Sequence, residues 1–223
     1  MKPKDLKSAF SFEQRRPCLL DQVFYVPIYY QNYDSFKLPA FYDYFANHHP
    51  VHVEYCSGNG DWIVEKAKQY PYKNWIAVEK RFDRVRKIWA KAKNLSLTNL
   101  LIVSGEALTF TLHYLPNQSI EEAYINFPDP WPKSKHAKNR LIQNPFLNEL
   151  ARILKPGKSM SIVTDDRNYA TQTVSLFCAH KDFTPFFPPP YFCLNREDYG
   201  TSWFEQLWKE KGRQIHYLQF TKK

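Results

Sequence analysis

The 223-residue sequence lacks the cysteine patterns of a metal-binding or disulfide-bonded protein. Its four cysteines form no C-x-x-C pair and no metal-ligand spacing with the seven histidines, so we expect reduced thiols and no metal site. An uninterrupted apolar segment is also absent, because the most apolar stretch, residues 19–30, is broken by Asp21, Gln22 and Pro27. The sequence therefore predicts neither an export signal nor a membrane span, and we expect a cytoplasmic protein.

Positive charge and aromatic side chains are abundant. The chain carries 31 Lys and Arg against 22 Asp and Glu, which gives a formal charge of +9, and 17% of its residues are aromatic. A basic protein of this kind suits a polyanionic partner, and aromatic rings can stack on bases as well as fill a core. The length fits one α/β domain with a full core, and the sequence contains no internal repeat.

From residue 51 onward the sequence alternates strand-like and helix-like segments. The expected strands cover residues 51–55, 75–78, 100–103, 123–127 and 159–164, and the expected helices cover residues 62–70, 82–93, about 139–154 and about 168–179. Such alternation indicates right-handed βαβ units, so we predict an α/β fold with a Rossmann-like, doubly wound, mostly parallel sheet. The tail at residues 214–221 alternates like an antiparallel closing strand.

The first 35 residues contain interspersed basic and aromatic residues and show no clear hydrophobic period. We expect residues 1–35 to form a basic N-terminal arm that could be flexible until it binds a partner. Residues 36–223 are expected to form a single domain.

A glycine turn follows the strand expected at residues 51–55. Gly58 and Gly60 lie where backbone must approach a ligand closely, and Glu79 ends the next strand 19 residues after Gly60. An acidic side chain at about this spacing accepts hydrogen bonds from ribose hydroxyls, although Glu79 could also be a surface residue.

Ile63 replaces the third glycine of the dinucleotide fingerprint, and Glu54 would repel a phosphate. S-adenosylmethionine fits better, because it is cationic at sulfur and carries no phosphate.

Glu106 follows the third strand, where it could receive the adenine edge of the cofactor. The alternative is a structural acid at the beginning of a helix, stabilised by the helix dipole.

Residues 124–141 read Y-I-N-F-P-D-P-W-P-K-S-K-H-A-K-N-R-L, an apolar strand followed by a proline-rich loop and a cluster of cations. Three prolines fix the loop, so Asp129 and Trp131 are expected at the carboxyl end of a strand, where ligands of α/β sheets bind. The carboxylate can bond a base edge and the indole can stack on a base. The following cations can hold phosphates: Lys133, Lys135, Lys138 and Arg140. The alternative is a turn over a core tryptophan, followed by a solvated helix.

With these motifs in this order, the chain resembles the bacterial tRNA (guanine(46)-N(7))-methyltransferase family from about residue 51 to the C-terminus. The proline-rich block is the most specific part of the resemblance, and T-D at residues 164–165 and S-W-F-E at residues 202–205 match two further elements. The resemblance implies a class I methyltransferase fold, with residues 36–223 as one S-adenosylmethionine-dependent methyltransferase domain. Three residues depart from the family pattern: Cys56 in place of a glycine, Glu106 in place of Asp or Asn, and Ser202 in place of Thr.

The resemblance also implies residue roles. Four carboxylates are expected to contact S-adenosylmethionine or border its methyl group: Glu54, Glu79, Glu106 and Asp129. Gly58 belongs to the cofactor loop, and Asp129 is the candidate catalytic residue. Residues expected to contact the tRNA or its guanine are Lys133, Asp165, Ser202, Trp203, Phe204 and Glu205. The predicted reaction is methyl transfer to N(7) of guanine 46 in tRNA, with no membrane and no obligate protein partner inferred. The alternatives are a methyltransferase acting on an exocyclic amine and a non-catalytic RNA-binding module.

Overall fold

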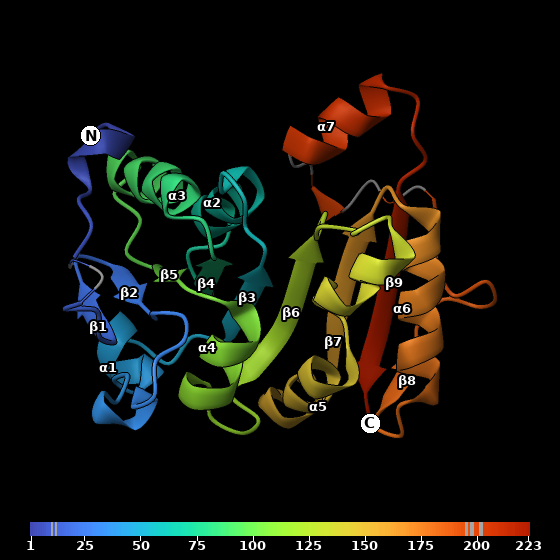
Figure 1. The fold of residues 1–223 in the computed structure, drawn as a ribbon, viewed down its shortest axis with the longest axis horizontal. Coiled ribbons are helices and arrows are strands. Elements are labelled where there is room, and N and C mark those ends of the chain that lie inside the picture. The colour runs from blue at the N-terminus through green and yellow to red at the C-terminus, as the bar shows by residue number, and fades with distance from the viewer. Residues whose placement is uncertain (10, 12, 195, 197–198, 201–202) are drawn as a thin grey trace. The chain divides into compact units, whose positions relative to one another are not determined.

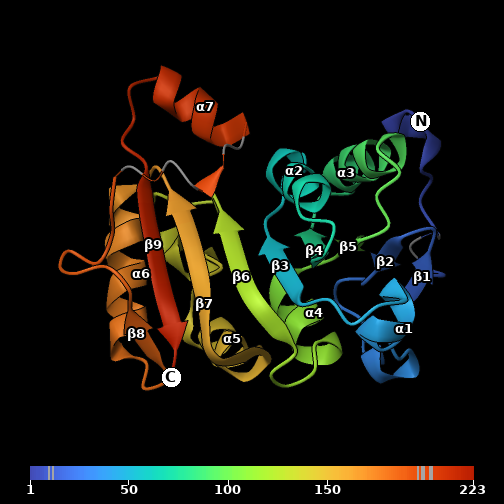
Figure 2. The same cartoon turned by 180° about the vertical axis from the view of Figure 1, so that it is seen from behind.

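Each half of the chain contributes its own set of hydrogen-bonded strands in the computed structural model. The structure describes residues 1–9, 11, 13–194, 196, 199–200 and 203–223, and these fall into two units, Met1–Leu115 and Pro116–Lys223. Unit 1 is drawn in blue to green in Figures 1 and 2, and unit 2 in green to red.

Unit 1 contains five strands in the order β1-β2-β5-β4-β3. They are β1 (Cys18–Leu20), β2 (Val23–Tyr25), β3 (Val51–Tyr55), β4 (Asn74–Glu79) and β5 (Leu100–Ser104). β1 is antiparallel to β2, whereas the pairs β2–β5, β5–β4 and β4–β3 are parallel. All residues of β3 and β4 are buried, as expected for parallel strands covered on both faces.

Helices cover both faces of the unit 1 strands. Figures 1 and 2 show α2 (Asp61–Gln69) and α3 (Phe82–Asn94) together on one side, and α4 (Ala107–Tyr114) on the other. The short helices of this unit are η1 (Pro3–Asp5), η2 (Tyr33–Ser35) and α1 (Phe41–Phe45).

Unit 2 contains four strands in the order β6-β7-β9-β8. They are β6 (Ile120–Asn126), β7 (Leu154–Thr164), β8 (Phe183–Pro185) and β9 (His216–Lys222). β6 and β7 are parallel, whereas β9 is antiparallel to both β7 and β8. Helices α5 (Asn144–Ile153) and α6 (Arg167–Ala179) lie on one face of these strands (Figures 1 and 2). The other helices of unit 2 are η3 (Ser134–Asn139) and α7 (Trp203–Glu210).

The predicted α/β fold, with a mostly parallel sheet and an antiparallel C-terminal strand, is confirmed. One helix boundary was wrong: the helix expected from about residue 139 begins at Asn144, because residues 134–139 form the separate turn η3. Pro145 lies in the first turn of α5, where its fixed φ and missing N–H are tolerated. β7 begins at Leu154, five residues before the expected start of that strand.

Part of the expected N-terminal arm belongs to the unit 1 sheet. β2 pairs with β5, and Val23 and Phe24 are completely buried. β1 and β2 were not predicted, because each strand has three residues and the turn between them contains no glycine. Asp21 and Gln22 make that turn with positive φ values of 43° and 71°. The division at residue 35 remains a prediction. No helix in the described part of the chain is long and apolar enough to span a membrane.

Candidate functional site

The loop after β3 has the tight backbone geometry that its glycines suggest. Gly58 and Gly60 have φ values of 56° and 78°, and a Cβ on Gly60 would lie 2.7 Å from Cγ1 of Ile88 in α3. Only glycine therefore fits at residue 60 without displacing the side chain of Ile88. Cys56 also has a positive φ, of 60°, in this loop. Glu54, at the carboxyl end of β3, is 1% exposed.

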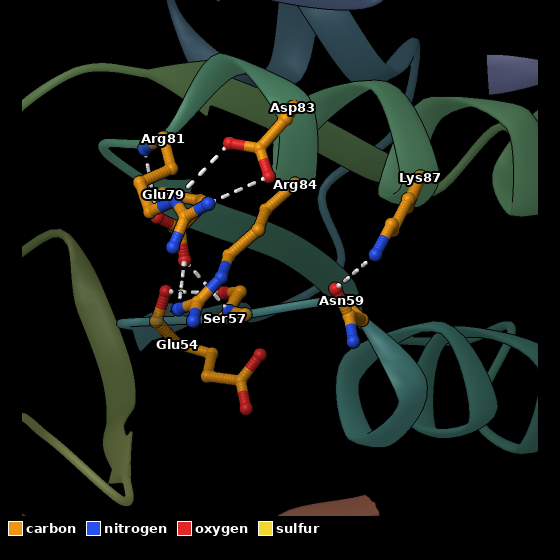
Figure 3. Close-up of polar contacts among 9 residues, drawn as sticks. Glu54, Ser57, Asn59, Glu79, Arg81, Asp83, Arg84 and Lys87 are labelled. Carbon is orange, nitrogen blue, oxygen red and sulfur yellow. Dashed lines mark hydrogen bonds and ion pairs between the residues drawn. The ribbon is translucent and has the colours of Figure 1, made fainter.

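Glu79 ends β4 and connects the loop to the start of α3. One carboxylate oxygen accepts a hydrogen bond from the backbone N–H of Gly58 at 2.8 Å, and the other accepts one from the N–H of Arg81 at 2.8 Å. The guanidinium of Arg84 lies 3.8 Å from the carboxylate (Figure 3). Burial nevertheless raises the pKa of Glu79, since it disfavours the charged form. The surface alternative for Glu79 is wrong, because the residue is 5% exposed.

Glu106 caps helix α4. Its carboxylate accepts hydrogen bonds from the backbone N–H groups of Leu108 and Thr109 at 3.1 and 2.7 Å, and from the Thr109 hydroxyl at 2.8 Å. This is the structural role that the sequence offered as an alternative. Because each carboxylate oxygen has two acceptor positions, the cap leaves room for a further donor. The contact of Glu106 with adenine remains a prediction.

The ends of the three strands lie close together within unit 1. The N–H of Ser57 donates to the carbonyl of Val78 at 3.1 Å, and the N–H of Gly105 donates to the carbonyl of Glu79 at 3.0 Å. Burial raises the pKa of Cys56 to about 12, and the negative charges of the nearby carboxylates act in the same direction: Glu79, Glu54 and Glu106. The predicted cofactor residues of unit 1 therefore form one cluster around the glycine loop.

This cluster suits S-adenosylmethionine in its chemistry. The narrow loop at Gly60 lets backbone approach a ligand, and the carboxylates of Glu54 and Glu79 offer acceptors and negative charge. A ligand with hydroxyls, an amine and a sulfonium is favoured by such groups, whereas a pyrophosphate would be repelled.

In unit 2, the proline-rich loop begins with a strained residue at the end of β6. Phe127 has a φ of 51°, and its N–H donates to the carbonyl of Val163 at 2.8 Å. Asp129 is exposed, and its carboxylate accepts a hydrogen bond from the N–H of Trp131 at 3.2 Å. Trp131 itself has a φ of 42° and is only partly buried, and its stacking on a base remains a prediction.

Arg140 links this loop to helix α6. Its Nε donates to the carbonyl of Pro130 at 2.7 Å, and another nitrogen bonds Gln172 in α6. The guanidinium also lies over the ring of Tyr169, 5.1 Å from its centroid. Arg140 therefore makes contacts within the protein, and its expected contact with a phosphate remains a prediction. The remaining cations of the cluster are exposed: Lys133, Lys135 and Lys138.

Asp165 and Asp166 follow β7 and have different partners. Asp165 forms an ion pair with Arg213, whose guanidinium lies 4.0 Å from the ring centroid of Trp208. Asp166 caps α6 by accepting a hydrogen bond from the N–H of Tyr169 at 2.8 Å. Asp165 is therefore already paired with a cation in this structure.

The last three residues of the S-W-F-E element, residues 203–205, begin helix α7. Glu205 is 3% exposed and accepts hydrogen bonds from the hydroxyl of Tyr217 at 2.7 Å and the ammonium of Lys209 at 2.6 Å. Trp203 is 48% exposed, and the ring of Phe204 lies 6.3 Å from that of Phe127. Ser202 lies outside the described residues.

A polar pair in unit 2 was missed. The hydroxyl of Tyr199 donates to the side-chain carbonyl of Asn126, the last residue of β6, at 2.7 Å, and both residues are buried. The signal was present, because Asn126 is a polar residue between the apolar end of a strand and the loop. The pair ties the C-terminal segment to the start of the proline-rich loop.

The fold defines the class of protein. A solved structure of the 16S rRNA methyltransferase KamB superposes with a TM-score of 0.54 at 20% identity, covering 82% of this chain and 92% of that one. The aminoglycoside resistance methyltransferase NpmB1 gives a TM-score of 0.53 at 16% identity, covering 81% and 91%. Together with the strand order and the glycine loop, these likenesses show a class I S-adenosylmethionine-dependent methyltransferase fold.

Sequence relatives define the family. A family described as "Putative methyltransferase" matches residues 48–218. A relative from Chlamydia abortus (strain DSM 27085 / S26/3) is 48% identical over 100% of this chain and 99% of its own length. One from Staphylococcus aureus (strain MSSA476) is 32% identical over 79% and 82%. Both are named tRNA (guanine-N(7)-)-methyltransferase. The chain belongs to the tRNA (guanine-N(7)-)-methyltransferase family, as the resemblance predicted, and its cofactor is S-adenosyl-L-methionine.

Proposed function

We propose that this protein transfers the methyl group of S-adenosylmethionine to N(7) of a guanine in tRNA, at position 46 of the variable loop, in the cytoplasm. The observation that carries this proposal is the full-length similarity to relatives named tRNA (guanine-N(7)-)-methyltransferase. The exposed carboxylate and the partly exposed indole in the P-D-P-W-P-K loop support it, since they suit a purine. The net charge of +9 supports a nucleic-acid substrate.

In this proposal the strand ends of unit 1 bind the cofactor. Glu79 accepts hydrogen bonds from the ribose hydroxyls, Glu54 favours the cationic part of the cofactor, and Glu106 reaches the adenine. Gly58 contributes backbone that has no side chain to exclude a ligand. Support comes from burial, because a desolvated carboxylate interacts more strongly with a donor than an exposed one does.

The chemistry needs no general base. Guanine N(7) is an unprotonated acceptor on the major-groove edge, and S-adenosylmethionine supplies an electrophilic methyl on sulfur. The protein's task is then to align the purine, and such positioning can contribute about 7–11 kcal/mol at its upper end. Asp129 stabilises the positive charge that develops on the purine. Its carboxylate is exposed, and among the described residues it accepts a hydrogen bond only from the N–H of Trp131, so it is available to a ligand.

The guanine is held by unit 2 in this proposal. Trp131 stacks on the base, which has to be turned out of the folded tRNA at an expense of a few kcal/mol. Asp165, Glu205 and the neighbouring Ser202, Trp203 and Phe204 contact the guanine or its tRNA. Lys133, which is exposed directly after the loop, contacts the target nucleotide. Asp165 and Glu205 are each paired with a cation, so they must share their oxygens with the N–H groups of the base.

The test is methyl transfer from labelled S-adenosylmethionine to unmodified tRNA by the purified protein alone, followed by nucleoside analysis. We expect 7-methylguanosine, and its loss when guanine 46 is replaced by adenine in the transcript. Methyl groups on an exocyclic amine would favour the amino-methyltransferase alternative. tRNA binding without any transfer would favour a non-catalytic RNA-binding module. Incorporation that persists in the adenine-46 transcript would contradict the assigned position.

A further inference from the structure

Arg84 points from helix α3 back toward the strand ends of unit 1. It lies in the first turn of α3, and its side chain extends toward Glu79 and Ser57 (Figure 3). The Nη1 atom of Arg84 lies 3.8 Å from Oε2 of Glu79, and the two side chains are 31% and 6% exposed. A charge pair that is mostly shielded from water interacts more strongly than one on the surface.

Glu79 lies among other acidic groups. The thiol of Cys56 is influenced by the carboxylates of Glu79, Glu54 and Glu106, and by the guanidinium of Arg84 in the opposite direction. The guanidinium of the nearby Arg81 is directed to Asp83, with hydrogen bonds of 3.1 and 2.9 Å. Arg84 thus contributes positive charge beside this cluster of carboxylates.

The charge state of Glu79 matters for the cofactor. Burial raises the pKa of Glu79, whereas the backbone N–H of Arg81, the guanidinium of Arg84 and the N–H of Gly58 lower it. A protonated carboxylic acid would present a donor and a weaker acceptor to the ribose hydroxyls. Burial thus disfavours the ionised form of Glu79, and the neighbouring guanidinium of Arg84 favours it.

We propose that Arg84 is a positioning residue for S-adenosylmethionine, which holds the Glu79 carboxylate in its ionised form and in the orientation that accepts the ribose hydroxyls. This inference rests on the proposed role of Glu79 in cofactor binding. Arg84 acts through Glu79 and needs no contact with the cofactor itself.

Lys87, one turn further along α3, provides a matched control. Its ammonium donates to the side chain of Asn59 in the glycine loop at 3.2 Å (Figure 3). Replacing Lys87 removes the same unit of charge from the same helix and also loosens the loop, but leaves the pair of Arg84 and Glu79 in place.

The experiment measures the dissociation constant of S-adenosylmethionine by calorimetry from about pH 4 to about pH 9, a range that includes the ordinary pKa values of a glutamate, about 4.3, and of an α-amino group, about 7.7–8.0. The parent protein is compared with Arg84→Gln, Arg84→Lys and Lys87→Gln. An opposite charge at this distance shifts a carboxyl pKa by about 1–3 units, so Arg84→Gln should move the acidic loss of affinity upward by about one pH unit. Below the Glu79 pKa of both proteins, its affinity should approach a value about tenfold weaker than the parent's, since one pKa unit is tenfold.

At high pH, Glu79 is ionised in every variant, and the affinities should converge. Titration of the cofactor's own amino group affects all variants alike, so it cancels in the ratio to the parent. Arg84→Lys should restore most of the parent profile because it keeps the charge, and Lys87→Gln should not displace the profile.

Three results would overturn the proposal: an unchanged profile in Arg84→Gln, a loss of affinity that is the same at every pH, or an equal displacement in Lys87→Gln. Thermal unfolding checks that each variant is folded, and Arg84→Met, which keeps the aliphatic stem, replaces Arg84→Gln if that variant does not fold. Glu79→Gln is measured in parallel. If Glu79→Gln binds S-adenosylmethionine as the parent does, the proposed role of Glu79 fails. If Glu79→Gln binds more weakly but the Arg84 variants keep the parent's pH profile, only the inference about Arg84 fails.

Discussion

The acids of the two units are held in different ways. In unit 1, Glu54 and Glu79 are 1% and 5% exposed, and Glu79 accepts backbone hydrogen bonds from two segments. In unit 2, Asp129 is exposed and bonds only the N–H of Trp131, two residues along its own loop, among the contacts that the structure describes. The carboxylates of unit 1 are therefore buried within the folded structure, whereas the carboxylate of Asp129 lies on an exposed loop.

The consequence is a difference in what each side chain contributes. Removing a buried acceptor leaves backbone N–H groups without a partner, so it affects stability together with ligand binding. Removing an exposed side chain that bonds its own loop affects stability little. Substitutions in unit 1 should thus change affinity and stability together, and substitutions at Asp129 should change catalysis alone.

The largest expected effect is at Asp129. Asp129→Ala should abolish measurable methyl transfer, a fall of at least about 100-fold in kcat, because a carboxylate beside the developing charge is lost. The melting temperature should stay at the parent value. Single-turnover methylation and thermal unfolding measure the two quantities. Near-normal turnover would remove Asp129 from the mechanism, and a large loss of stability would remove the contrast between the units.

Glu79→Ala should change both quantities. The loss of a charged acceptor should weaken S-adenosylmethionine binding by about 1.5–3 kcal/mol. The variant should also be less stable without any ligand, because the N–H groups of Gly58 and Arg81 lose their acceptor. Calorimetry with the cofactor and denaturant unfolding without it give the two values. An unchanged dissociation constant would contradict the ribose assignment.

Arg140 connects the loop of unit 2 to helix α6, so a substitution here should change stability as well as catalysis, as in unit 1. Arg140→Ala should lower the free energy of unfolding by about 1–3 kcal/mol and reduce turnover, because the Pro130 carbonyl loses a charged donor. Arg140→Lys should restore little, since an ammonium lacks the planar fork. The dependence of tRNA affinity on salt should stay at the parent value; a lower slope would show that Arg140 also contacts a phosphate.

The position of Arg140 illustrates what the sequence could predict. The buried strands and the glycine turn were predictable because local signals agree there: apolar runs, glycines and an acidic strand end. The partners of Arg140 were not, since they depend on how α6 packs beneath the loop. A cation after an acidic loop looks the same in sequence whether it binds a phosphate or a carbonyl.

Two further differences have physical reasons. Helix α4 was not predicted, because its sequence, A-L-T-F-T-L-H-Y, has no polar face to give a helical period. Strands β1 and β2 were missed because they have three residues each and depend on pairing with β5 for their stability. In the candidate site, Glu54 and Glu79 could be located from spacing, whereas Asn126 and Tyr199 required the fold to bring them together.

The exposed lysines of unit 2 should show a smaller effect, on affinity. Lys133→Ala, Lys135→Ala and Lys138→Ala should each lower the slope of log affinity against log salt by about 0.7–0.9 if the side chain contacts one phosphate. Lys133→Ala should also reduce turnover at saturating tRNA, because this residue directly follows the loop. S-adenosylmethionine binding should be unaffected in all three. Slopes identical to the parent's would mean that these side chains simply face solvent.

The smallest expected effect returns to unit 1, where Cys56 gives the glycine loop a strained residue with a φ of 60°. A left-handed conformation costs a residue with a Cβ about 1–2 kcal/mol, and glycine loses about 0.5–1 kcal/mol more entropy on folding. Cys56→Gly should therefore raise the free energy of unfolding by up to about 1.5 kcal/mol. Cys56→Ala, which keeps the Cβ, should give no gain, and denaturant unfolding compares the two. If Cys56→Gly is instead less stable than Cys56→Ala, packing of the partly buried side chain outweighs the backbone strain at residue 56.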